Sequence, residues 1–143
     1  MHLEPGFALV LRNCPSAAHR LVVHWLQVVD PNRRFVHEGD VDVWPFTSSA
    51  YSPAHAFLFN DCLLYARKRR GMYIEWGSFA FFQKQQIVLE ETREGEGLVF
   101  VLRSETEALG IRCSSPETKS LWIEHLKRCI YDSRRGNILA PQS

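Results

Sequence analysis

From residue 35 to residue 114, apolar side chains recur with a period close to two, and turn signals interrupt them at short intervals. Val41 and Val43, for example, alternate with Asp40 and Asp42. Successive side chains of a strand point to opposite faces of a sheet, so this alternation is typical of half-buried antiparallel strands. The pattern predicts a mainly β fold, and 143 residues are enough for one hydrophobic core.

Turn signals divide this region into seven predicted strands. Asn60 and Asp61 mark a hairpin turn, because their short polar side chains tolerate turn conformations. A loop rich in proline and serine, residues 45–53, separates the first two strands. The predicted strands are residues 35–44, 55–59, 62–68, 72–82, 85–91, 98–103 and 109–114. Short strands at this spacing are typical of an antiparallel sheet or barrel.

A helix is predicted to follow the last strand. Ser115 is placed to cap this helix, and Pro116 suits its first turn. Trp122 and Leu126 fall on one apolar stripe at helical spacing, so both are predicted to be structural residues that pack on the sheet. The polar tail that follows, residues 132–143, is expected to fray.

Residues 1–34 differ from the rest of the chain and are predicted to form a linker with a short helix over residues 14–30. Asp30 precedes Pro31, and the residue before a proline avoids the helical conformation, so the helix ends there. Six apolar residues recur in it at helical spacing: Ala18, Leu21, Val22, Trp25, Leu26 and Val29. Such an amphipathic helix needs a surface that covers its apolar face.

Charge and residue spacing argue against several classes of function. A formal net charge of +1 lacks the strong positive field that attracts nucleic acid. The four cysteines and six histidines show no metal-ligand or catalytic spacing, which predicts no metal, no cofactor and no enzyme activity. No run of about 18 apolar residues and no secretion signal occurs, so a cytoplasmic protein with reduced cysteines is expected.

Three stretches of the sequence carry a family resemblance. Residues 35–41 read FVHEGDV, residues 55–66 read HAFLFNDCLLYA, and residues 116–126 read PETKSLWIEHL. They are similar to the first strand, the second and third strands, and the C-terminal helix of pleckstrin-homology (PH) domains in Dbl-type Rho guanine-nucleotide exchange factors. The resemblance implies a PH domain over residues 35–131, in which seven antiparallel strands form a bent sandwich or barrel. Trp122 stands at the family's signature tryptophan, which plugs the open corner of the sheet.

This resemblance implies a docking module in signalling rather than an enzyme. Nucleotide exchange in the family belongs to a separate helical domain, for which residues 1–34 are too few. The implied partners are a Rho-family GTPase or the adjacent exchange domain, and an anionic phospholipid surface. The alternative is a cytosolic adaptor domain of the same superfold, which binds a peptide as an added strand and binds no lipid.

The signature with which PH domains grip phosphoinositides is absent from the sequence. That signature has a lysine late in the first strand and a basic-x-arginine at the start of the second, where this chain has Val43, Pro53 and His55. A weaker lipid-binding site of basic and aromatic residues is predicted at one rim of the sheet. Its candidate residues are Trp44, Phe46, His55, Arg67, Lys68, Arg69 and Arg70.

Other interpretations of these residues remain open. The basic run from Arg67 to Arg70 also fits an ordinary solvated turn. Trp44 and Phe46 also fit a loop folded onto its own sheet, or a protein-docking patch. The resemblance places residues 104–107 near the same rim, where their carboxylates would repel acidic lipid. The expected localisation is cytoplasmic, with peripheral contact at the membrane.

Overall fold

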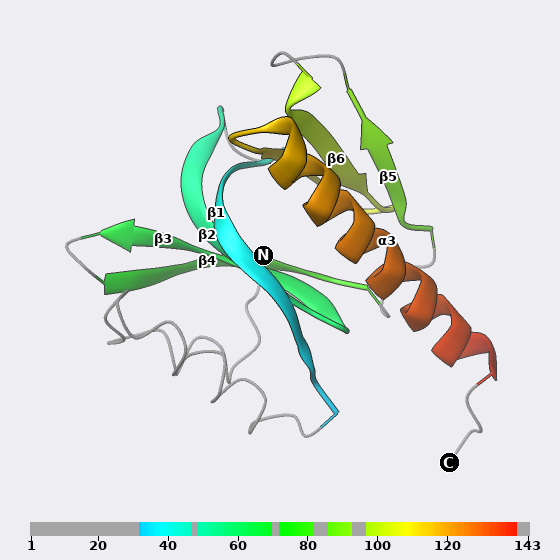
Figure 1. Cartoon of the computed structure of the whole chain (residues 1–143). Helices are drawn as coiled ribbons and strands as arrows, with labels where there is room; N and C mark the ends of the chain where they lie inside the picture. The colour runs from blue at the N-terminus through cyan, green and yellow to red at the C-terminus, as the bar shows by residue number, and fades with distance from the viewer. Residues whose placement is uncertain (1–31, 47–48, 70–71, 82–85, 93–96, 140–143) are drawn as a thin grey trace.

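Seven antiparallel strands and a C-terminal helix make up the described part of this computed structural model (Figure 1). The structure describes residues 32–46, 49–69, 72–81, 86–92 and 97–139, of which residues 68–69, 72–75 and 134–139 are described as backbone only. The elements are β1 (Phe35–Pro45), β2 (Ser52–Phe59), β3 (Cys62–Arg69), β4 (Met72–Ala80), β5 (Val88–Glu91), β6 (Val99–Arg103), β7 (Ala108–Arg112) and α3 (Pro116–Leu139). The predicted seven strands with a terminal helix are confirmed. The helix predicted over residues 14–30 lies outside the described residues.

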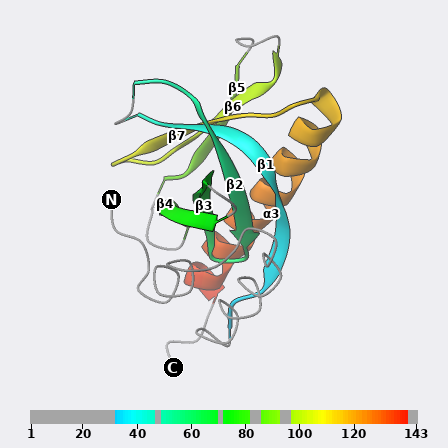
Figure 2. The ribbon, with the colours of Figure 1, turned by 90° about the vertical axis from the view of Figure 1, so that its left-hand side faces the viewer.

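All seven strands belong to one sheet, in the order β4-β3-β2-β1-β7-β6-β5. β1 pairs along its length with β2 and, from Asp42 to Pro45, with β7 as well. Val43 therefore has a neighbour on each side, Ser52 and Ile111. Because one long strand serves both halves of the sheet, the twist bends the sheet around on itself (Figure 2). The helix α3 packs at the corner between the two halves.

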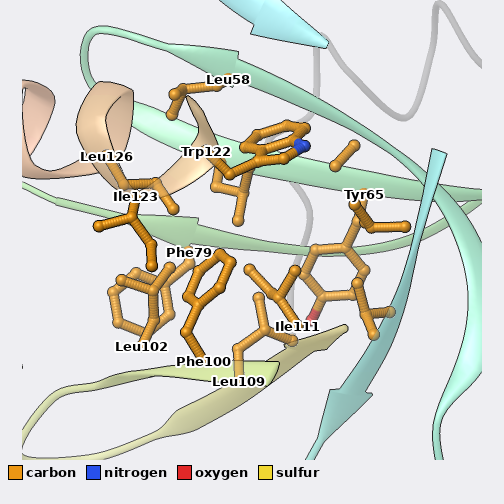
Figure 3. Close-up of a cluster of buried hydrophobic side chains, with 14 of the residues drawn as sticks. Leu58, Tyr65, Phe79, Phe100, Leu102, Leu109, Ile111, Trp122, Ile123 and Leu126 are labelled. Atoms are coloured by element: carbon orange, nitrogen blue, oxygen red, sulfur yellow. The ribbon is translucent and has the colours of Figure 1, made fainter. Parts of the chain in front are cut away.

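The hydrophobic core lies on the inner side of this bend and takes alternate residues from each strand. Val41 and Val43 are buried in it, whereas Asp40 and Asp42 lie on the outer face. Figure 3 shows Trp122 entering the cluster from α3 among side chains contributed by strands of both halves. The alternation seen in the sequence is therefore the alternation between core and solvent.

Trp122 closes the corner of the sheet against β1. Its side chain is buried, and its ring meets the ring of His37 edge-on, with centroids 4.6 Å apart. A Cβ at Gly39 would lie 3.8 Å from the indole, so the backbone of β1 is in direct reach of it. The His125 ring also stacks with the His37 ring, with centroids 5.0 Å apart. Burial, and then the neighbouring His125, lower the pKa of His37 against the opposing effect of Glu38, which favours a neutral ring beside the indole.

α3 begins where the sequence predicted and ends later. Ser115 caps the helix, because its Oγ accepts a backbone N–H of the first turn at 3.1 Å. The prediction that the tail frays is wrong for residues 132–139, since the helix continues to Leu139, and residues 140–143 lie outside the described residues. Ser133 Oγ donates to the carbonyl of Asn60 in the β2–β3 turn (3.3 Å), and this tertiary contact holds the polar end of the helix on the sheet. No helix among the described residues is long and apolar enough to cross a membrane.

Several strand ends differ from the predicted ones. β2 begins at Ser52 instead of His55, because the ladder with β1 continues until Ser52 lies opposite Val43. β4 ends at Ala80 and β5 begins at Val88, so the predicted strands 72–82 and 85–91 are shorter than expected at their facing ends. The pairing partner available across the sheet, rather than the local pattern, decides where each strand stops.

Candidate docking surfaces

Three aromatic side chains gather on the outer face of the sheet at the two ends of the β1–β2 loop. The Trp44 ring lies 4.4 Å from the Phe46 ring and 5.6 Å from the Tyr51 ring, measured between centroids. Trp44 is paired with Gly110 of β7, and a Cβ at Gly110 would lie 2.5 Å from the Tyr51 hydroxyl. Tyr51 therefore rests on backbone that a side chain would obstruct. Both ends of the loop fold onto their own sheet, and Phe46 is the most exposed of the three rings at 41%.

Two arginines from the outer face complete this aromatic cluster. The Arg103 guanidinium lies over the Phe46 ring at 5.5 Å, and its Nε contacts Glu90 at 3.1 Å. The Arg112 guanidinium lies over the Tyr51 ring at 4.9 Å and binds Asp42 at 2.8 Å. Each cation is therefore held between a ring and a carboxylate. The sequence analysis missed both arginines, although each stands at an outward position at a strand end.

A shallow groove of about 520 Å³ runs beside Phe46, between the start of the β1–β2 loop and the β6–β7 turn. Arg103 and Glu107 lie on its walls. The turn from Ser104 to Glu107 is tight, because Ser104 donates its N–H to the Glu107 carbonyl at 2.8 Å and its Oγ accepts the Glu107 N–H at 3.1 Å. The resemblance placed this acidic turn at the rim, and the structure has it there.

His55 lies apart from the aromatic cluster, in the middle of the β1–β2 pair. Its Nε2 is 2.7 Å from Glu38 Oε1 and its Nδ1 is 2.8 Å from Asp40 Oδ1. The side chain is nearly buried, at 8% exposure. Both ring nitrogens thus face carboxylates of β1. A phosphate at this ring would have to displace one of them and would meet the negative charge of the other.

The basic run begins inside β3 rather than in a turn. Arg67 lies over the ring of Trp76 in β4, with 4.0 Å between the guanidinium carbon and the ring centroid. Lys68 and Arg69 pair through their backbone with β4, and Arg70 lies outside the described residues. Arg67 thus contacts Trp76, whereas Trp44 packs with Phe46 and Tyr51. The described side chains of the predicted lipid site therefore form separate clusters.

A second buried apolar surface lies on the outer face of β2 and β3. We call it the outer patch and define it as Phe57, Phe59, Cys62, Leu64 and Ala66. Each of these side chains is at most 4% exposed, yet none belongs to the main core cluster. Alternate residues of the same strands, including Leu58 and Leu63, point to the opposite side and do belong to it. β2 and β3 are thus buried on both faces, a property that the apolar run from Ala56 to Phe59 in β2 signals.

The chain enters the sheet through a fixed contact at one end of this outer patch. Arg33 binds Asp61 in the β2–β3 turn with two nitrogens, at 2.9 and 3.1 Å, and lies over the Phe59 ring at 5.7 Å. The Asn60 side chain accepts the Arg34 N–H at 2.6 Å and donates to the Asn32 carbonyl at 3.2 Å. Residues 32–34 are therefore anchored to the β2–β3 turn before β1 begins.

Comparison with protein families places this architecture in a known group. The family model described as SOS1/NGEF-like PH domain matches residues 29–129, which includes every strand, the Arg33 anchor and most of the tryptophan-bearing helix. A comparison with curated protein sequences gave no match. The family assignment is therefore based on the match of this PH domain model to residues 29–129.

Solved structures of similar fold come from exchange factors and from pleckstrin. The DH/PH domains of PDZ-RhoGEF, in complex with GTP-γ-S-activated RhoA, superpose with a TM-score of 0.62 at 13% identity, covering 90% of this chain and 36% of that one. An activated truncation of Vav1 in its apo form gives 0.61 at 16% identity, covering 75% and 28%. The carboxyl-terminal PH domain of pleckstrin gives 0.56 at 15% identity, covering 68% and 97%. The chain thus spans about a third of the exchange-factor structures and nearly all of the single PH domain, and the likeness is one of fold.

Proposed function

The chain belongs to the SOS1/NGEF-like PH domain family, and we propose that it is the non-catalytic docking module of a Rho-family exchange factor. The proposed partners are a Rho-family GTPase or the adjacent exchange domain. PH folds in the similar exchange-factor structures occur in one chain with a DH domain, and one of those structures holds RhoA. A docking role on a GTPase or an exchange domain is consistent with that setting.

One observation favours protein over a lipid headgroup as the main partner. His55, Arg103 and Arg112 each already contact a carboxylate. Around these three side chains there are more carboxylates than guanidinium groups. A headgroup phosphate would have to break these contacts and approach the remaining negative charge. A protein surface can instead use the exposed Phe46 ring with Arg103 behind it, because aromatic and arginine side chains dominate binding energy at protein interfaces.

Replacing Phe46 with aspartate is expected to weaken binding to a Rho-family GTPase by about tenfold, since it removes the exposed aromatic anchor beside the groove. The chain would be titrated against RhoA loaded with GTP-γ-S and against a Dbl-type exchange domain, with affinity measured by calorimetry. Leu121→Asp is the matched control, because Leu121 is equally exposed, at 42% against 41%, but lies on α3. Equal effects of the two substitutions, or no binding to either probe, would contradict the proposal.

Weak contact with an anionic membrane is a second candidate, favoured by the exposure of Phe46 and by the basic run that begins at Arg67. Charge reversal at Arg69 and Arg70 is expected to reduce sedimentation with vesicles containing phosphatidylserine and phosphoinositide by at least tenfold, since each basic residue contributes about 1 kcal/mol near such a surface. Neutral vesicles provide the baseline. Vesicle binding that does not change on charge reversal would remove this candidate.

A further inference from the structure

The outer patch is covered although no described helix packs on it as α3 packs on the inner side. Among the described side chains, Arg33 and Phe35 contact Phe59, and His55 contacts Phe57. The main core cluster contains side chains of α3 and inward-facing side chains of the strands. None of the five members of the outer patch belongs to it. A contiguous patch with two phenylalanines and a leucine is rarely left in water by a monomeric protein. These contacts lie on the two phenylalanines, whereas all five side chains are at most 4% exposed, so we expect a further layer over the patch.

The start of the described chain lies next to the patch. Arg33 is held by Asp61 and lies over Phe59, a member of the patch. The Asn32 carbonyl accepts a hydrogen bond from Asn60 in the same turn. The described chain therefore begins at the end of the outer patch, and the 31 residues before Asn32 are the longest stretch of sequence outside the described residues.

We infer that residues 14–30 form an amphipathic helix that lies on the outer patch and covers it as a third layer. A helix of this length is about 26 Å long, which matches the roughly 26 Å of the eight-residue strand β2. The apolar stripe that recurs at helical spacing along this segment supplies the matching surface. The inference concerns the chain's own packing and is independent of the proposed GTPase partner.

Cys62 provides a direct probe, because it is the one cysteine of the outer patch. Cys113 and Cys129 belong to the main core cluster and serve as internal reporters of global unfolding. Burial raises the pKa of each core thiol to about 11, which keeps both slow toward alkylating reagents. Alkylation followed by peptide mass spectrometry reads the three thiols separately.

In the full chain, the double substitution Leu21→Asp and Trp25→Asp is expected to speed alkylation of Cys62 at least tenfold and to leave Cys113 and Cys129 protected. His24→Asp with Gln27→Asp is the matched control, because it adds the same charge to the opposite face of the predicted helix and should leave Cys62 protected. If Cys62 stays as protected in the stripe variant as in the control, the inference is wrong.

Two measurements on the unmodified chain cover the case in which the double variant unfolds and all three thiols react. Nuclear Overhauser contacts from the Trp25 indole to the Leu64 methyl groups are expected, and their absence would overturn the inference. Protection of Cys62 should also be the same at every point of a dilution series. Protection that disappears on dilution would assign the cover to a second copy of the chain instead.

Discussion

Substituting alanine for Trp122 is expected to lower the free energy of unfolding by about 3 to 5 kcal/mol. The indole is almost entirely buried, lies against His37 and Gly39 of β1, and closes the corner between the two halves of the sheet. Its removal leaves a cavity that the sheet fills poorly, because β1 is held there by its ladder with β2 and, from Asp42 onward, by its ladder with β7. Urea denaturation monitored by far-ultraviolet circular dichroism, instead of tryptophan fluorescence, would measure the loss.

Trp122→Phe provides the control that separates packing from hydrogen bonding. The indole Nε1 is buried and has no hydrogen-bond partner within the described residues, so phenylalanine loses ring volume and breaks no polar contact. Its expected cost is about 1 to 2 kcal/mol, less than half that of alanine. A thermal melt of Trp122→Ala that matches the unchanged chain would show that the helix does not plug the corner.

Replacing Arg33 with methionine is expected to destabilise the chain by about 2 to 3 kcal/mol, because it leaves Asp61 without its main counter-charge. The Arg33 side chain is only 4% exposed and Asp61 is 20% exposed, so solvent can compensate for the lost contact only in part. The Arg34 amide, which bonds to Asn60 beside this pair, should exchange its hydrogen faster in the variant. Denaturant midpoints and amide hydrogen exchange measure the two effects.

A double-mutant cycle tests whether this anchor acts as a pair. The double substitution Arg33→Met with Asp61→Leu should be less destabilised than Arg33→Met alone, since no isolated charge then remains. Strictly additive costs would mean that the two side chains stabilise the fold independently.

The local pattern of the sequence was enough to predict the strands, the helix start and the apolar stripe that carries Trp122, whereas the role of that side chain in closing the corner came from the family resemblance. The alternation of Val41 and Val43 with aspartates indicates which face of β1 is buried in the core. Ser115 before Pro116 marks the start of the helix. These signals depend on residues close together in the sequence, so they can be recognised without knowing the tertiary contacts. The predicted helix end failed because Ser133 is held by Asn60, a residue distant in sequence.

The candidate site was predicted less completely, because its chemistry depends on partners across the sheet. His55 and Phe46 were identified as candidates from position and type alone. Nothing in the local sequence indicates that His55 faces both Glu38 and Asp40, or that Arg103 lies over Phe46. On this surface the side chains of His55, Arg103 and Arg112 already contact carboxylates, which the local sequence did not indicate.

The sequence by itself determined seven strands followed by a helix, since strand and helix periods are properties of neighbouring residues. Only the tertiary structure decided which charged side chains meet on the outer face of the sheet and which of its apolar side chains are buried. Asp42 meets Arg112 from 70 positions away, and a shift of one residue in register would turn either side chain to the other face. The outer patch depends on the same register, because the ladder of β2 with β3 brings Phe57 opposite Leu64 on that face.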